Sequence, residues 1–534
     1  MMTPAPEDAL ASALLRPESY PHPVDEVVLH ETHISRVFLA GAYAYKVKKP
    51  VRLPFVDFGT LESRRRYCEE ELRLNRRFAP ALYLEVVEIR GPAHAPRVGG
   101  PGALLEYALK MRRFSQDALA SALLRRGALT PRLMADFAAY LADFHSRLAP
   151  APHTARYGTP DAVRHNALGN FDEIAGLLEA PADRAALAVV RDWTEREFRA
   201  RQEALRERHA AGMVREVHGD LHLRNIVALD DTLVPFDCIE FSEELRWNDV
   251  MSEVAFLVMD LMDHGAAPLA WTFLDAYLES SGAYSGLSVL RYYLVYRAMV
   301  RAKIHLLRAH QPGIDPVATT RLMQAYRGYI DLARHCAEAV RPALILMHGY
   351  SGSGKSTLAA ALVPALGAIR VRSDVERKRL AGLPPLAHTA AGLERALYAP
   401  GATSETYARL YDAARAGVAA GYTVIVDATF LRRAHRAAVI AIAHELGATA
   451  VAIDAQAPLE VLRERIAART ADPSEATVQV LASQVATAEP IDASEGLPVV
   501  TVDTTAGISP QVMQSVVARV TAITGNTLAG TPGR

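Results

Sequence analysis

A phosphate-binding sequence in the last third of the chain restricts the possible folds more than any other feature. Residues 349–356 read Gly-Tyr-Ser-Gly-Ser-Gly-Lys-Ser and match the pattern G-x-x-x-x-G-K-[ST] at every fixed position. A loop that wraps a phosphate turns its backbone N–H groups inward, and glycine allows this because it has no Cβ to clash at positive φ. The apolar run 343–347 predicts a buried strand before the loop, and 357–363 predicts a helix after it. Strand, loop and helix in this order predict a nucleotide site.

The residues of this loop have distinct expected roles. Lys355 is expected to reach the β- and γ-phosphates of ATP, and the Ser356 hydroxyl to bind Mg²⁺. Asp427 ends the apolar run 423–426 in the manner of a Walker B strand, which adds it to the ATP site. The full set expected to contact the nucleotide in and just after the loop is Gly349, Ser351, Gly352, Ser353, Gly354, Lys355, Ser356 and Thr357.

Beyond Pro342, strand and helix patterns alternate as far as about residue 525. The alternation predicts an α/β domain with a doubly wound parallel sheet over 341–525. Its expected strands are 344–348, 369–372, 423–427, 449–454 and 498–502, and the tail 526–534 is expected to be disordered.

Charged residues follow two elements of this domain. Asp374 and Arg377 come after the second expected strand, at the sheet edge where ligands bind in such domains. Asp374 is expected to take the proton of an acceptor hydroxyl and Arg377 to bind the acceptor, although a helix cap explains Asp374 equally well. Arg465 and Arg469 lie on or after a later helix and fit a lid that brings guanidinium groups to the transferred phosphoryl group; a solvated helix face is the alternative.

The bulk properties of the chain restrict its class. A length of 534 residues predicts two or three domains. The formal net charge of −1 gives no electrostatic reason for binding nucleic acid or an anionic membrane. Three cysteines, far apart in the sequence, predict a reducing compartment. Because neither a signal peptide nor an apolar segment of membrane-spanning length is evident, a cytoplasmic location is expected.

The chain before Pro342 has the pattern of a domain of another kind. After an N-terminal extension, 1–24, strand patterns at 36–40, 44–48, 82–90 and 103–114 flank a charged helix at 61–78. They predict a small α+β lobe up to about residue 114. From Thr130 to about residue 340 the pattern is helical, interrupted by short strands at 214–217, 225–229 and 233–236. Residues 25–340 are therefore expected to form one domain with a strand-rich lobe and a helical lobe.

Three polar residues near these short strands predict phosphoryl transfer. Asp220 and Asn225 lie in the connection 218–225, and Asp237 directly follows the run 233–236. Phosphoryl transfer needs a carboxylate that accepts the proton of the acceptor and oxygen ligands that hold Mg²⁺ on the phosphates. Asp220 fits the first role, and Asn225 and Asp237 fit the second. Each residue alone is also explained as a turn, cap or strand-end residue, but the joint spacing favours the catalytic interpretation.

The sequence His218-Gly-Asp-Leu-His-x-x-Asn225, followed by Asp237, resembles the aminoglycoside phosphotransferase and choline kinase branch of the protein-kinase-like fold over about residues 25–340. The resemblance implies that Asp220 is the catalytic base and that Asn225 and Asp237 bind magnesium. The chain departs from the family at Leu223-Arg224, where Pro-Gly is usual. It also lacks a clear glycine-rich loop, for which Ala40-Gly41-Ala42 is a poor substitute.

The same resemblance implies a strand lysine, paired with a helix glutamate, that orients the α- and β-phosphates. Lys46 is matched to the lysine, with Lys48 as the alternative on the same strand face. Glu71 is matched to the glutamate, with Glu70 as the alternative. Met111 resembles the hinge residue that carries the adenine.

The C-terminal part, 341–525, resembles small P-loop kinases of the gluconate, shikimate and polynucleotide 5′-kinase type. Arg372-x-Asp374-x-x-Arg377 is most similar to the last of these, in which the aspartate acts as base and the arginine contacts the acceptor. The neutral charge and the lack of a basic, aromatic-rich groove argue against a nucleic-acid acceptor.

Together these features predict a bifunctional enzyme. Each half is expected to transfer the γ-phosphate of ATP, with Mg²⁺, to a hydroxyl group of a small molecule. The alternative makes the N-terminal half a ligand-binding regulatory module that controls a single C-terminal kinase or ATPase. The sequence leaves the acceptors and the oligomeric state open.

Overall fold

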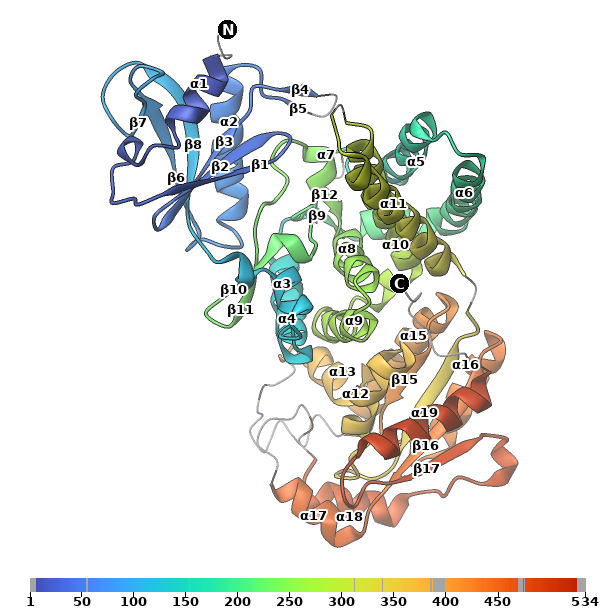
Figure 1. Ribbon diagram of the computed structural model, residues 1–534. Helices are drawn as coiled ribbons and strands as arrows, with labels where there is room; N and C mark the ends of the chain where they lie inside the picture. The colour runs from blue at the N-terminus through green and yellow to red at the C-terminus, as the bar shows by residue number, and fades with distance from the viewer. Residues whose placement is uncertain are drawn as a thin grey trace. The chain divides into compact units, whose positions relative to one another are not determined.

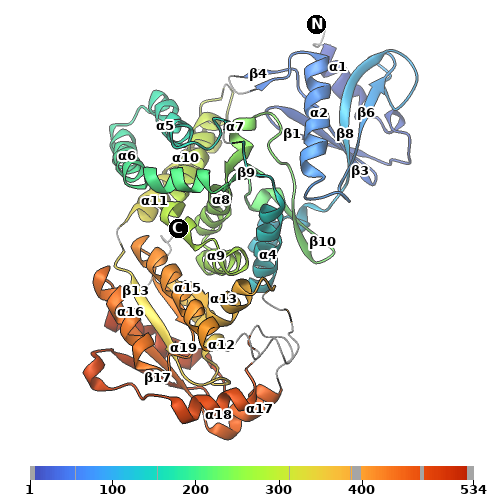
Figure 2. The ribbon, with the colours of Figure 1, turned by 180° about the vertical axis from the view of Figure 1, so that it is seen from behind.

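The computed structural model describes residues 6–53, 56–152, 154–311, 313–338, 340–384, 387, 399–468, 474 and 476–525 (Figures 1 and 2). The contacts within the chain divide it into two compact units. The first unit comprises residues 1–129, 149–158 and 212–253, and the second comprises 130–148, 159–211 and 254–534.

The first unit combines a six-stranded sheet, in the order β1-β2-β3-β8-β6-β7, with the helix α2. All the strand pairings in this sheet are antiparallel. The elements up to the last strand of the sheet are α1 (Pro6–Ala13), η1 (Pro17–Ser19), β1 (Val27–Glu31), β2 (Ser35–Ala40), β3 (Tyr43–Lys48), β4 (Arg52–Leu53), β5 (Val56–Asp57), α2 (Leu61–Asn75), β6 (Tyr83–Arg90), β7 (Arg97–Val98) and β8 (Leu104–Arg112).

Alternation along β3 separates its apolar side chains from its lysines. Tyr45 and Val47 enter the apolar core of the sheet, so Lys46 and Lys48 lie on the opposite face. That face is covered by α2, which begins at a capping box formed by Thr60 and Ser63. The two lysines are therefore held against a helix.

The rest of the first unit consists of short elements, and the connections between them contain the candidate residues Asp220 and Asp237. The strand β9 pairs with β12, and β10 pairs with β11, both antiparallel. The segment 217–222 lies between β9 and η3, and the segment 236–242 lies between β11 and α7. The elements are η2 (Gln116–Ala118), α3 (Ala120–Arg125), β9 (Val214–Glu216), η3 (Leu223–Asn225), β10 (Ile226–Leu229), β11 (Thr232–Pro235), α7 (Glu243–Arg246) and β12 (Trp247–Asp249).

The second unit begins with a group of helices. The longest helix of the group is α6, and α10 packs along α11. The helices are α4 (Pro131–Arg147), α5 (Pro160–Leu177), α6 (Pro181–Ala210), α8 (Val250–Asp263, whose first residues belong to the first unit), α9 (Ala267–Ser281), η4 (Tyr284–Gly286), α10 (Leu287–Ala309) and α11 (Pro316–Ala337). The helix α9 also contacts α12 and β14 of the sheet domain that follows.

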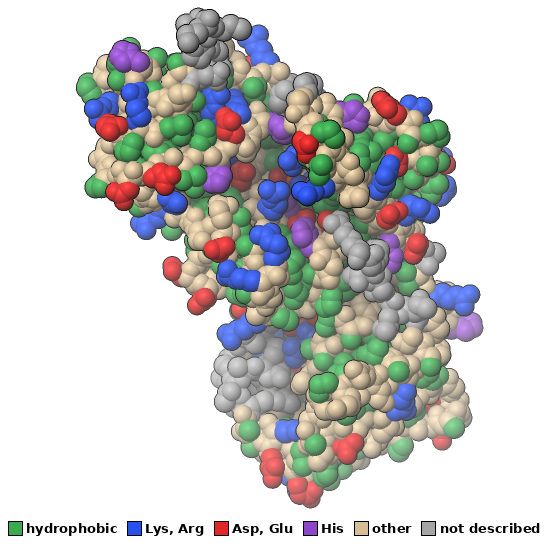
Figure 3. All heavy atoms as spheres, in the orientation of Figure 1, with side chains coloured by type: hydrophobic (Ala, Val, Ile, Leu, Met, Phe, Trp, Pro, Cys, Tyr) green, Lys and Arg blue, Asp and Glu red, His purple; other side chains and the backbone are tan. Residues whose placement is uncertain are grey.

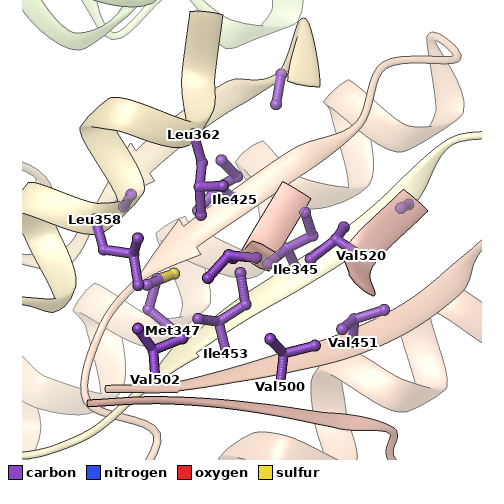
Figure 4. Packing of buried hydrophobic residues seen from close by; sticks show 14 of the residues in the cluster. Ile345, Met347, Leu358, Leu362, Ile425, Val451, Ile453, Val500, Val502 and Val520 are labelled. Carbon is purple, nitrogen blue, oxygen red and sulfur yellow. The ribbon is translucent and has the colours of Figure 1, made fainter. Parts of the chain in front are cut away.

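The sheet domain of the second unit has the strand order β14-β15-β13-β16-β17, and all of its pairings are parallel. The helices α12 and α19 cover one face, where Leu358, Leu362 and Val520 pack against Ile345 and Ile453 (Figure 4). The elements are β13 (Ala343–His348), α12 (Lys355–Leu366), β14 (Ile369–Arg372), α13 (Ser373–Leu380), α15 (Pro400–Ala419), β15 (Val424–Asp427), α16 (Arg433–Glu445), β16 (Thr449–Gln456), α17 (Leu459–Ala467), α18 (Val478–Thr487), η5 (Ala493–Glu495), β17 (Val499–Asp503) and α19 (Pro510–Thr524).

The predicted fold class is confirmed: a strand-rich α+β part, a helical part and a parallel α/β domain follow one another. All five strands expected after Pro342 form within two residues of their predicted ends. The charged helix ends at Asn75 rather than at residue 78, and the strands β1, β4, β5, β7 and β12 were not predicted. The predicted tail 526–534 lies outside the described residues.

The surface and the helices agree with a chain of nearly balanced charge. Acidic and basic side chains are interspersed over the face shown in Figure 3. Within the part of the chain that the structure describes, no helix combines the length and the apolar character needed to span a bilayer.

Two candidate nucleotide sites

A buried ion-pair network lies at the centre of the first unit. Lys46 of β3 donates from Nζ to Glu71 Oε1 of α2, over 2.7 Å, and to Asp237 Oδ1. Burial alone would lower the pKa of Lys46, but Asp237 and Glu71 outweigh it and hold the pKa well above its ordinary value. The lysine is therefore a fixed positive charge beside an acidic residue.

The second lysine of β3 binds the same glutamate. Lys48 Nζ donates to Glu71 Oε2, over 2.7 Å, and to Glu240 Oε1. Burial favours the neutral form of Glu71, but Lys46 and Lys48 outweigh this and lower its pKa to about 2. The alternative glutamate, Glu70, instead accepts from Arg73 and Arg246. The structure thus brings Lys46, Glu71 and Asp237 together and adds Lys48 and Glu240.

Asp237 has a backbone conformation that is uncommon for a residue with a side chain. Its φ is +63°, in the left-handed region, and its N–H donates to the buried Tyr83 Oη over 2.9 Å. The side chain of Asp237 is 44% exposed, whereas that of Lys46 is 12% exposed and that of Glu71 is 0% exposed. Such strained positions are concentrated at functional sites. The carboxylate of Asp237 is accessible as a ligand.

The connection between β9 and η3 is held by buried side chains. His218 is fully buried, and its Nε2 donates to Phe236 O over 2.8 Å while its Nδ1 accepts from the Asp220 N–H. Burial lowers the pKa of His218, in agreement with a neutral ring that donates and accepts at once. The Gly219 N–H donates to the buried Glu253 Oε2 over 2.8 Å.

The candidate base and one candidate magnesium ligand are hydrogen-bonded to each other. Asn225 Nδ2 donates to Asp220 Oδ2 and to Asp220 O, each over 3.0 Å. His222 Nε2 lies 3.4 Å from the same Asp220 Oδ2. Because the amide nitrogen of Asn225 is used in this way, its carbonyl oxygen is the atom suited to a cation.

Two further features of the first unit were considered from the sequence. Met111 lies near the end of β8, opposite Ala44 of β3. The turn between β2 and β3 is short, because β2 ends at Ala40 and β3 begins at Tyr43. A Cβ at Gly41 in this turn would lie 2.9 Å from Pro23 O, so the turn is packed against the N-terminal extension.

The second candidate site is the loop between β13 and α12. Gly349, Gly352 and Gly354 all have positive φ, at +134°, +85° and +80°. A Cβ would lie 2.5 Å from Ala455 O at Gly349 and 2.8 Å from Leu462 O at Gly352. The loop thus needs glycine for both conformation and space. It ends at Lys355, the first residue of α12, so the helix N-terminus faces the loop.

The Ser356 hydroxyl and the Asp427 carboxylate form a pair at this helix N-terminus. Ser356 Oγ donates to Asp427 Oδ1 over 3.0 Å. Asp427 is 3% exposed, and among the described residues its Oδ2 has no hydrogen-bond partner. A buried carboxylate oxygen that accepts no hydrogen bond, together with a neighbouring hydroxyl oxygen, provides the oxygen ligands that a hard cation prefers. These residues therefore fit Mg²⁺.

The phosphate-binding loop is closed by residues that no motif indicated. Gln484 of α18 accepts from the Ser351 N–H over 2.9 Å and donates to Ser351 Oγ over 3.0 Å. Thr504, which follows β17, donates to Ser353 O over 2.6 Å. Lys355 Nζ lies 3.5 Å from Tyr350 O, within the same loop.

The structure describes one of the two arginines that were predicted to belong to a lid. Arg465 of α17 donates to Gly352 O over 3.4 Å and to Thr505 O over 3.1 Å, so it joins the loop to the segment after β17. Arg469 lies outside the described residues. Thr357 follows Ser356 in the first turn of α12.

The candidate acceptor residues lie on α13. Asp374 is the second residue of this helix, and the N-cap position is taken by Arg372, so Asp374 is not the N-cap. Arg377 is 8% exposed and donates to Thr403 Oγ1 of α15 over 3.3 Å. The negative charge of Asp374 and the positive charge of Arg377 both act on Tyr407 of α15, whose pKa is raised mainly by burial.

Comparison with known proteins gives one match to a family model and several relatives. A model described as an AAA domain matches residues 344–491. Uncharacterized proteins of Mycobacterium tuberculosis and Mycobacterium bovis are 30% identical over 469 residues, which cover 87% of this chain and 91% of each relative.

Solved structures of kinases are similar to separate parts of the chain. A sugar kinase from Janibacter sp. HTCC2649 is 18% identical, with a TM-score of 0.25, and the match covers 34% of this chain and 94% of that one. An amicoumacin kinase is 13% identical, with a TM-score of 0.37, over 61% and 93%. An aminoglycoside phosphotransferase from Alicyclobacillus acidocaldarius is 15% identical, with a TM-score of 0.35, over 63% and 96%.

The match to the AAA domain coincides with the loop, strand and helix arrangement around Lys355. This match agrees with the predicted P-loop domain in the C-terminal part of the chain. The predicted enzyme class, an ATP-dependent kinase, is taken up in the proposal below. The acceptors and the roles of single residues stay predictions.

Proposed function

The chain belongs to the protein family of these two mycobacterial relatives, and we propose that it is a bifunctional ATP-dependent phosphotransferase. Each unit would transfer the γ-phosphate of ATP to a hydroxyl group of a small molecule. One observation carries the proposal: each unit has a lysine and, near it, side-chain oxygen atoms of the kind that bind Mg²⁺, namely those of Asp237 in the first unit and of Ser356 and Asp427 in the second.

In the first unit, the proposed roles follow from the hydrogen bonds. Asp220 is the base, because Asn225 and His222 both hold its Oδ2 and so fix the direction of the carboxylate. Lys46, oriented by Glu71, binds the α- and β-phosphates. Asn225 and Asp237 supply oxygen atoms to Mg²⁺, and Met111 supports the adenine.

In the second unit, the loop 349–356 binds the phosphates through its N–H groups and Lys355. Ser356 and Asp427 hold Mg²⁺, which when bound neutralises charge on the β- and γ-phosphates. Asp374 is the base for the acceptor and Arg377 binds the acceptor. Arg465, and Arg469 outside the described residues, serve the transferred phosphoryl group.

A second candidate function rests on the turn between β2 and β3. This turn replaces the glycine-rich loop of the resembled family, and the carbonyl of Pro23 lies against Gly41 within it. A first unit that binds nucleotide weakly would act as a regulatory module for a single kinase site at the loop 349–356. The complete set of Asp220, Asn225 and Asp237 favours the bifunctional proposal instead.

The test uses the full chain and three forms of it. Wild type, Asp220→Asn and Lys355→Ala are each incubated with ATP labelled on the γ-phosphate, Mg²⁺ and an extract of small metabolites, and labelled products are separated by mass. We expect two groups of products, one lost in each variant. If Asp220→Asn makes every product that wild type makes, the first unit is not a kinase and the regulatory module replaces it.

A further inference from the structure

The edge of the parallel sheet in the second unit is covered by a helix from outside the sheet domain. The strand β14 is the outermost strand next to β15, and α9 contacts both β14 and α12. Asp275 of α9 accepts from the backbone N–H of Arg370 in β14 over 2.8 Å. This side chain satisfies a donor that an edge strand would otherwise present to solvent. The helix α9 is thus built onto the sheet.

Two acidic residues of α9 bind two arginines of β14. Arg370 Nη2 donates to Asp275 Oδ2 over 3.2 Å and to Glu279 Oε2 over 2.5 Å. Arg372 Nη1 donates to Glu279 Oε1 over 3.4 Å. The four side chains are between 7% and 17% exposed, so water screens these charges little.

One of these arginines also reaches the proposed magnesium site. Arg372 Nε lies 3.5 Å from Asp427 Oδ2, the carboxylate oxygen that has no hydrogen-bond partner among the described residues. The other oxygen of Asp427 accepts from Ser356 of the phosphate-binding loop. Two ion pairs and one hydrogen bond therefore connect Glu279, through Arg372 and Asp427, to Ser356.

The charges along this connection decide what Asp427 can bind. Asp275, Glu279 and Asp427 carry three negative charges against the two positive charges of Arg370 and Arg372, which leaves one negative charge. Without Glu279, Arg372 would lose a negative charge that lies beside its guanidinium, and its positive charge would act more strongly on Asp427. It would then compete with a cation for the carboxylate and repel that cation, in a site where charges interact strongly.

We propose that Glu279 is a positioning residue for the second nucleotide site: it holds and neutralises Arg372, so that Asp427 keeps its negative charge for Mg²⁺. The proposal rests on the proposed function of the loop 349–356. It extends that site to a helix that ends 68 residues before Gly349 and lies outside the matched range 344–491.

The test measures binding of a fluorescent ATP analogue to the full chain as Mg²⁺ is raised. Binding that disappears in Lys355→Ala is assigned to the second site. Glu279→Gln should raise the Mg²⁺ concentration for half-saturation of this binding about five-fold or more, a typical size for coupling between sites. Arg372→Gln should lower it or leave it unchanged, because it removes the competing positive charge.

The double variant Glu279→Gln with Arg372→Gln separates charge from packing. It restores the net charge of wild type, so its half-saturation should return to within about two-fold of the wild-type value. A merely structural role for Glu279 would leave the double variant at least as weak as Glu279→Gln. Glu445→Gln is the matched control, since Glu445 pairs with Arg415 at an exposed position, and it should behave as wild type.

Each outcome decides between the two claims. If Lys355→Ala loses binding but Glu279→Gln titrates as wild type, the role of Glu279 is wrong and the nucleotide site stands. If Lys355→Ala keeps all binding, both claims are wrong. Should circular dichroism show that Glu279→Gln does not fold, Arg372→Gln alone still decides. A higher Mg²⁺ concentration for half-saturation in that variant would contradict the charge argument.

Discussion

A single carboxylate, that of Glu71, balances two lysines in the first unit. One oxygen accepts from Lys46 and the other from Lys48, and each lysine has a second acidic partner in the segment 237–240. The lysines nevertheless differ in exposure: the Lys46 side chain is 12% exposed and that of Lys48 is 0% exposed. Their substitutions should therefore have different effects.

Lys48→Met should destabilise the fold, whereas Lys46→Met should mainly weaken nucleotide binding. Loss of Lys48 leaves Glu240 and one oxygen of Glu71 buried without their cation, and breaking a buried pair in this way costs roughly 3–5 kcal/mol. Thermal unfolding and nucleotide titration of both variants measure the two effects. A Lys48→Met protein as stable as wild type would contradict the buried network.

Asp220→Asn should lower turnover in the first unit and leave ATP binding nearly unchanged. Loss of a positioned base costs roughly 10²- to 10⁴-fold in rate. Asp237→Ala should instead weaken binding of Mg²⁺ and ATP, since its exposed carboxylate lies beside Lys46. A transfer assay and calorimetry on both variants separate the roles; near-full turnover by Asp220→Asn would exclude it as the base.

At the scale of elements, the phosphate-binding loop depends on the helix α17 packed beside it. The closest atom to a Cβ at Gly352 would be Leu462 O of α17, at 2.8 Å. The neighbouring contacts of Arg465 and Gln484 also come from α17 and α18. The loop therefore takes its shape from two later elements as well as from its own glycines.

Gly352→Ala should reduce nucleotide binding at the second site roughly ten-fold or more, because either the loop or α17 must move. Gly447→Ala is the matched control: Gly447 also has positive φ, at +65°, but nothing lies within 4 Å of a Cβ there. Both variants are titrated with the fluorescent ATP analogue. Equal losses in the two variants would mean that backbone strain, and not the contact with α17, is responsible.

The sequence predicts those parts of the two sites whose residues are close together in the chain. The loop 349–356 and the segment 218–225 could be proposed as sites from the sequence because their residues lie together in short stretches of chain. The alternation of β3 placed Lys46 and Lys48 on one face, but only the packing of α2 shows that both bind Glu71. Glu240, Gln484 and Glu279 belong to no motif, because their partners are distant in sequence and are brought close only by tertiary packing.

At the scale of the whole molecule, the contact between α9 and β14 should make stability depend on pH. Burial raises the pKa of Asp275 to about 6, although Arg370 opposes the shift. The folded state then binds more protons than the unfolded state between about pH 4 and pH 6. The stabilising contribution is complete below about pH 4 and is lost as the pH rises through about 6.

Asp275→Asn removes this titration, so the stability of wild type relative to the variant should fall as the pH rises from about 4 to about 7. The change should amount to at most about 3 kcal/mol. Melting temperatures of both proteins across this range measure it, and other titrating groups cancel in the difference. A constant difference between the two proteins would contradict the raised pKa of Asp275.

The cover that α9 gives to β14 has a consequence for how such a chain can be rearranged in evolution. A recombination breakpoint at Pro342 would separate a sheet domain from the helix that binds its edge strand, and an uncovered edge invites pairing with other chains. Gly367 would also lose the ring of Trp271, which lies 3.1 Å from the position of a Cβ there. Recombination should therefore rarely transfer the sheet domain alone, and we expect the helices and the sheet of the second unit to be inherited together.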